Sequence, residues 1–233
     1  VLVLKRGVKG AAEATVISQY ISGFGVAVHT LLLSKESRFS PKHVDKKTIG
    51  EVTNFSFLTC LQQSVMNLGI LMVQTRVNTF GPVVMAAFST GVKIDAFAYM
   101  PLQDYGNAFS TFTAQNFGAG KEERIKRGMK IAFITSLLFS IMISLIVFIA
   151  SPSLMKIFVG ESEREIIDIG TGYLRIEGAF YALIGFLFLF YGLFRAIGKP
   201  GMSFILTIIS LGTRVLLSYT ISDIPSVGVL GIW

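Results

Sequence analysis

Six long apolar stretches, separated by short polar loops, constrain this sequence more than any other feature. Residues 131–150 contain no charge, and residues 202–221 contain only Arg214. A helix of about 20 apolar residues spans a hydrocarbon core of roughly 30 Å. Six such stretches, in a chain with 52% hydrophobic residues, are more than a soluble core of 233 residues can bury. The sequence therefore predicts an all-α fold, a polytopic bundle of about six membrane-spanning helices.

The chain is expected to form one transmembrane helical lobe over residues 1–233. We predict helices at 10–33, 50–80, 82–116, 129–150, 170–194 and 201–221, with the start of a further helix at 227–233. The first stretch is too long for a signal peptide, and no cleavage site of small residues follows it. The chain begins at Val1 and stops just as a new apolar segment begins. We therefore interpret it as a fragment of a longer transporter-like chain.

The net charge of +7 comes largely from loops beside the apolar stretches, a distribution that argues against nucleic-acid binding. Loops 34–47 and 117–130 each hold five basic and two acidic residues, whereas 151–168 holds two basic and four acidic residues. Basic loops remain on the cytoplasmic side and meet anionic lipid headgroups. This predicts a multi-pass protein of the plasma membrane, of the bacterial cytoplasmic type, with 34–47 and 117–130 inside. The basic residues before the first helix disagree with this orientation.

Site-directed labelling tests this orientation. Cysteines introduced at Ser37 and Ser162, in a Cys60→Ala background, should differ in their reaction with an impermeant thiol reagent. Ser162 should be labelled from outside and Ser37 should not, since their loops carry opposite net charge. The reverse pattern would overturn the orientation.

Polar residues form a stripe on each of two consecutive helices. In 50–80 the stripe includes Gln63 and Asn67, and in 82–116 it consists of Asp95, Tyr99, Gln103, Asn107 and Thr111, four residues apart. Residues at this spacing share one helix face. Because the loop between the helices is very short, the helices must be antiparallel, and Asp95 should lie near mid-bilayer at the depth of Asn67. A carboxylate facing lipid there would cost about 2.5–3.5 kcal/mol or more, so Asp95 must face protein or water.

We predict that the two stripes line an aqueous substrate or ion pathway formed by Gln63, Asn67, Asp95, Tyr99, Gln103 and Asn107. Pro101 removes a backbone hydrogen bond and favours a kink in the second helix, as in transporters whose broken helices line a cavity. The alternative is that the stripes are hydrogen bonds between helices and that Pro101 only bends a long helix. Charges at Arg76, Arg175 and Glu177 are expected to be structural ion pairs, and Arg214 could serve either role.

Other chemistries find little support. The lone Cys60 excludes a disulfide framework, and His29 and His43 lack metal-ligand spacing, so we predict no metal site and no cofactor beyond a coupling ion. No catalytic triad or paired carboxylates are present. Gly118-Ala119-Gly120-Lys121 resembles part of a phosphate loop, but it follows a helix, so a helix C-cap is the better interpretation. Residues 121–130 are expected to form a short interfacial helix.

Several motifs resemble those of the multidrug and toxic compound extrusion (MATE) family. The segment 100–121 reads MPLQDYGNAFSTFTAQNFGAGK, in which a proline-containing helix ends in a Gln-Asn-x-Gly-Ala-Gly turn. Further matches read GVKGAA at 7–12, LQQS at 61–64 and FRAIGKP at 194–200. The resemblance runs along essentially the whole chain. It implies a span from the sixth helix to the start of the twelfth, in a transporter of two six-helix lobes around a central cleft.

The resemblance implies a secondary antiporter that exports organic cations or drug-like compounds in exchange for protons or sodium. Its partners would be small, cationic organic substrates, membrane lipids and the missing N-terminal lobe. The sodium-linked branch has carboxylates where this chain has approximately Met66 and Ile184, and the proton-linked branch has an Asp on a helix absent here. The alternatives are a flippase for lipid-linked sugars, which calls for a more cationic cleft, and an intramembrane enzyme, which calls for a catalytic dyad. The chain is expected not to be an enzyme.

Overall fold

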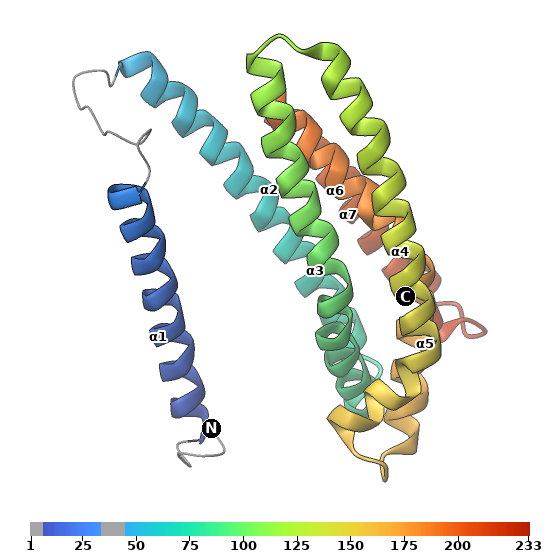
Figure 1. The fold of residues 1–233 in the computed structure, drawn as a ribbon. Helices are drawn as coiled ribbons and strands as arrows, with labels where there is room; N and C mark the ends of the chain where they lie inside the picture. Colours follow the sequence, from blue (N-terminus) through green and yellow to red (C-terminus); the bar gives the residue numbers. More distant parts are fainter. Residues whose placement is uncertain (1–6, 34–44) are drawn as a thin grey trace. The chain divides into compact units, whose positions relative to one another are not determined.

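A computed structural model describes residues 7–33 and 45–233 (Figure 1). The chain divides into two compact units, Val1–Val52 and Thr53–Trp233. The first unit contains helix α1 (Gly7–Val28), a π-helical extension at His29–Leu33 and the first turns of α2 (Lys46–Asn78). Ser37 and most of the predicted loop 34–47 lie outside the described residues.

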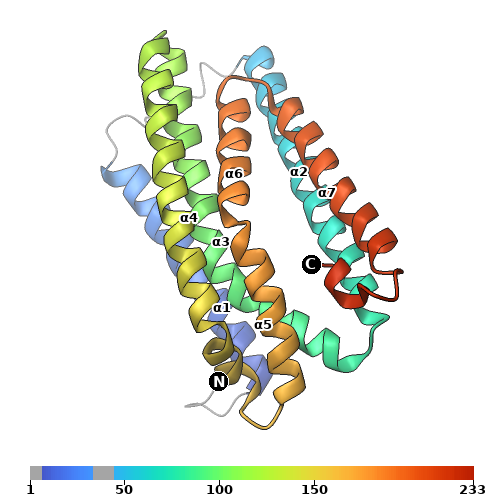
Figure 2. The ribbon, with the colours of Figure 1, turned by 90° about the vertical axis from the view of Figure 1, so that its right-hand side faces the viewer.

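The second unit is a helical bundle, which Figure 2 shows from the side. It contains the rest of α2, then α3 (Pro82–Gly118), α4 (Glu122–Val159), α5 (Arg164–Ala179), α6 (Tyr181–Ala196), α7 (Pro200–Ile221) and a 3₁₀ turn at Gly228–Gly231. Among the described residues, α2, α3, α4 and α7 are each long and apolar enough to cross a membrane, and the bent pair α5 and α6 makes a fifth candidate. The predicted all-α, polytopic class is confirmed.

Short turns join α2 to α3, α3 to α4 and α6 to α7. Pro82 opens α3 and Pro200 opens α7, at the position where the missing N–H costs no hydrogen bond. Gly120, with φ of +66°, closes α3, and the Lys121 N–H donates to the Asn116 carbonyl at 2.9 Å. This confirms that the Gly-rich turn is a helix C-cap. The predicted separate interfacial helix at 121–130 is wrong, because Glu122–Val159 is one continuous helix.

The stretch predicted as one helix over 170–194 is two helices, which meet at Phe180 with a bend of 53°. A bend of this size frees backbone carbonyls from their intrahelical partners. Two serines of α4 donate to carbonyls at the bend: Ser144 to Gly178 at 2.6 Å and Ser140 to Tyr181 at 3.4 Å. Side-chain donors of this kind let a broken helix persist at membrane depth. The bend also places Tyr181 at the first position of α6.

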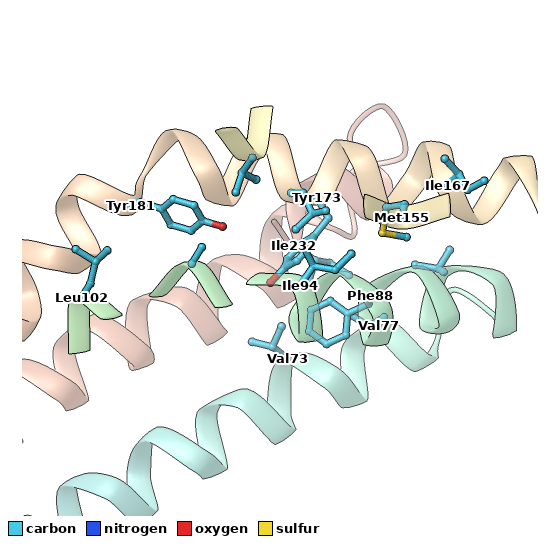
Figure 3. Close-up of a cluster of buried hydrophobic side chains, with 14 of the residues drawn as sticks. Val73, Val77, Phe88, Ile94, Leu102, Met155, Ile167, Tyr173, Tyr181 and Ile232 are labelled. Carbon is cyan, nitrogen blue, oxygen red and sulfur yellow. The ribbon is translucent and has the colours of Figure 1, made fainter. Parts of the chain in front are cut away.

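The core forms where α3 packs against α4, α5 and α6, and Figure 3 shows its apolar side chains, among them Leu102, Met155 and Tyr181. The contact between α3 and α6 is especially close. A Cβ added to Gly192 would lie 2.5 Å from the Gly106 carbonyl oxygen, and one added to Gly106 would lie 2.8 Å from the Phe188 oxygen. Small residues permit this backbone approach, which is a common way of packing helices in membranes.

Candidate functional site

Asp95 lies in the interior of the bundle, on α3. It is 8% exposed, and its carboxylate accepts a hydrogen bond of 2.5 Å from the Tyr181 hydroxyl. Among the described residues, no ion pair includes Asp95. The carboxylate is therefore buried with a neutral hydrogen-bond donor and without a neighbouring cationic side chain in ion-pair contact.

A second buried carboxylate, Glu177, lies near the end of α5, also 8% exposed. It forms an ion pair with Arg214 of α7, with Oε1 and Nη2 2.5 Å apart. The guanidinium is partly open to its surroundings, since the Arg214 side chain is 42% exposed. The pair joins α5 to α7 and gives Glu177 a counter-ion.

Both acids line one cavity of about 230 Å³ between α2, α3, α5, α6 and α7. The aromatic residues in its wall are Phe88, Tyr99, Tyr173, Phe188 and Tyr191, and its charged residues are Asp95, Glu177 and Arg214. When all three charged groups are ionised, the cavity carries one excess negative charge. A chamber with aromatic walls and an unmatched carboxylate is suited to a cation. We call it the acidic cavity.

The structure separates the six predicted pathway residues into groups. Asp95 and Tyr99 line the acidic cavity. Gln63, Gln103 and Asn107 line a second, polar cavity of about 130 Å³ between α2, α3 and α6. Asn67 is exposed and is absent from the walls of both cavities.

Asn67 lies away from Asp95 because a different face of α2 meets the bundle. The residues of α2 that line the acidic cavity are Met66, Gly69, Ile70 and Val73. Gly69 is in contact with Leu211 of α7, and a Cβ at this position would clash with that side chain. With Gly69 facing α7, Asn67, two residues earlier, lies on a nearly opposite side of α2.

Sequence reasoning missed Tyr181 as the partner of Asp95, and it did not pair Glu177 with Arg214. The sequence contained one indication that these residues belong to the site: Glu177 and Tyr181 are four residues apart, on either side of the bend. The expected structural role of Arg76 agrees with its contacts: Nε donates to Ser222 at 2.8 Å, and the guanidinium pairs with Asp223. Arg175 lies over the Phe148 ring, 5.0 Å from its centroid.

Comparison with known proteins places these features in a family. A model of the MatE family matches residues 56–220. The chain is 26% identical over 235 residues to the probable multidrug resistance protein NorM of Thermotoga maritima, and the match covers 97% of this chain and 49% of that protein. It is 23% identical over 211 residues to the multidrug export protein MepA of Staphylococcus haemolyticus, covering 90% of this chain and 46% of that protein.

Solved structures show the same fold. A crystal structure of MATE in complex with MaL6 matches with a TM-score of 0.87 at 21% identity, covering 99% of this chain and 52% of that chain. A MOP superfamily transporter from Pyrococcus furiosus matches with the same score, identity and coverage. The chain spans about half the length of the curated relatives it matches. The family model covers more than half of the chain and the bundle shares the fold of the solved structures, so the chain belongs to the MatE family of multi-pass membrane transporters.

Proposed function

We propose that the full-length protein is a secondary antiporter that exports organic cations or drug-like compounds in exchange for protons or sodium ions. The observation that carries this proposal is the burial of Asp95 in the acidic cavity, where, among the residues that the structure describes, the Tyr181 hydroxyl is its one hydrogen-bond donor. The neighbouring acid, Glu177, already has Arg214 as its counter-ion. Asp95 is therefore the acid in this cavity whose negative charge is available to bind a transported ion.

An unmatched carboxylate at membrane depth can drive exchange. Its charge costs about 2.5–3.5 kcal/mol or more in an apolar environment, and a bound proton, sodium ion or organic cation relieves that cost. The carboxylate cannot hold two of these ions at full strength at the same time, so the entry of one favours the release of the other. This competition couples the export of substrate to the entry of the ion.

The acidic cavity is large enough to hold only part of a drug-sized substrate. Its volume of about 230 Å³ is below the roughly 300–1,000 Å³ of typical drug-sized pockets. We propose that it holds the cationic group of the substrate against Asp95 and the aromatic walls. The rest of the molecule would lie in a cleft shared with an N-terminal lobe of the same transporter, since the chain spans about half the length of its relatives.

Transport in proteoliposomes of the full-length protein tests the antiporter. An inward-directed gradient of either pH or sodium should accelerate the export of a cationic dye, and the effective gradient identifies the coupling ion. If the rate of dye export is the same with a pH gradient, with a sodium gradient and with no gradient, the protein is not an antiporter of these ions.

Pro101 offers a test of the conformational cycle. It lies inside the continuous helix α3, between Asp95 and the residues that line the polar cavity. If its missing N–H lets α3 bend as the cavity opens to alternate sides, Pro101→Ala should slow dye efflux at unchanged protein level. Unchanged efflux would mean that the proline serves packing alone.

A further inference from the structure

The polar cavity is chemically distinct from the acidic cavity. Four amide side chains line it, Gln62, Gln63, Gln103 and Asn107, together with the Thr59 hydroxyl. Arg195, in the last turn of α6, supplies the charged group. An open groove of about 650 Å³ adjoins it and shares Thr59, Asn107 and Arg195 in its wall. Among the described residues that line the two spaces, none is an aspartate or a glutamate.

The Arg195 guanidinium reaches from α6 to α3. Its Nη2 donates to the Asn107 amide oxygen at 2.9 Å, and its Nε donates to the Tyr191 carbonyl at 3.3 Å. Both partners are uncharged, and among the described residues no ion pair includes Arg195. A guanidinium has five N–H donors, so these two bonds leave a forked set of donors for another group.

A structural role explains only part of this arrangement. A basic residue in the last turn of a helix stabilises the helix dipole, and the bond from Nε to Tyr191 serves that purpose. It does not require the head of the side chain to reach α3. Lys199 provides a contrast, because it is an exposed basic residue four positions further on that lines neither space.

We propose that Arg195 and the surrounding amides form an oxyanion site, which binds the carboxylate or phosphate group of a ligand. Planar guanidinium groups bind such groups in a bidentate manner, and the amide N–H groups of the glutamines can donate to the remaining oxygens. The oxyanion could belong to a soluble organic acid or to the headgroup of an anionic lipid. The transporter would then have two sites of opposite preference, a cation site at Asp95 and an anion site at Arg195.

A pair of fluorescent probes that lack a cationic group tests this site without involving Asp95. Dansylglycine carries a carboxylate and its methyl ester does not. The full-length protein is reconstituted in nanodiscs of phosphatidylcholine, and probe binding is followed by fluorescence polarisation. Wild-type protein should bind the acid about tenfold more tightly than the ester, as expected for a charge-assisted, bidentate contact. Equal affinity for the two probes overturns the proposal, however the variants behave.

Variants assign the effect to Arg195. R195Q should bind the acid about tenfold more weakly than wild type and the ester equally well. R195K keeps the charge but lacks the planar fork, so its affinity for the acid should be intermediate. K199Q removes one positive charge from the short loop between α6 and α7 and should behave as wild type. If K199Q weakens binding as much as R195Q does, the effect is general surface charge and the site is refuted.

A lipid readout distinguishes the two sources of the oxyanion. In nanodiscs that also contain phosphatidylglycerol, native mass spectrometry counts the lipids that remain on each protein. One more retained phosphatidylglycerol on wild type than on R195Q, with displacement of dansylglycine, identifies a lipid headgroup. Equal lipid retention with the acid preference intact identifies a soluble organic acid. Both outcomes support the oxyanion site, and equal behaviour of wild type and R195Q in both assays overturns it.

Discussion

Replacing Asp95 by asparagine should lower the export of a cationic dye about tenfold or more in cells that produce the full-length protein, as expected for a typical coupling energy between two sites. The substitution removes the charge but keeps the size of the side chain, and its amide oxygen can still accept the hydrogen bond from Tyr181. The loss should therefore appear in transport and not in protein level. Dye efflux and immunoblotting of membranes measure the two quantities.

Asp104 provides the matched control. It lies on the same helix but is exposed, and it is absent from the walls of both cavities. D104N makes the same change in charge, so it should export dye at close to the wild-type rate. Normal export by D95N across pH 6 to 8 would show that Asp95 is a structural residue. Equal losses in D95N and D104N would show that the effect does not depend on the acidic cavity.

Gly192→Ala should destabilise the bundle by about 1–3 kcal/mol, the usual cost of forcing an extra group into a packed core. The new Cβ would lie 2.5 Å from the Gly106 carbonyl oxygen, which is backbone and cannot rotate away. Helices α3 and α6 would have to separate, and the contact between them is part of the core that holds Asp95. Thermal unfolding of the purified full-length protein measures the change.

Gly212→Ala is the control for this prediction. Gly212 lies inside α7, and, among the described residues, nothing beyond its chain neighbours and the adjacent backbone of its own helix is within 4 Å of the position that its Cβ would occupy. Alanine also favours a helix over glycine by up to about 1 kcal/mol, so this variant should melt at or above the wild-type temperature. If Gly192→Ala and Gly212→Ala melt together, the close contact between α3 and α6 does not limit stability.

Much of the fold could be predicted because the signals are local. Apolar length predicted the spans, and the Gly-Ala-Gly turn predicted the end of α3. The break at Phe180 could not be predicted in this way, because the hydrogen bonds that support it come from Ser140 and Ser144 on another helix. The interfacial helix was predicted from charge alone, but the continuous α4 begins at Glu122.

The candidate site could be predicted only in part for a similar reason. Asp95 could be identified from its position in the predicted helix alone, because a charge at membrane depth is costly. Its partner Tyr181 is 86 residues away in sequence and approaches it only through the packing of α3 against α6. Asn67 was expected at the same depth, but the face of α2 that meets the acidic cavity is the one with Gly69 against Leu211, and the spacing of polar residues along the helix does not reveal this.

The central claim is that Asp95 couples the movement of substrate to the movement of an ion. The most direct measurement compares wild type and D95N in proteoliposomes of the full-length protein, with the flux of a cationic dye recorded with and without an imposed pH or sodium gradient. We predict that wild-type flux rises with one of the gradients and that D95N flux responds to neither. A D95N flux that rises with the gradient as steeply as wild type would contradict the claim.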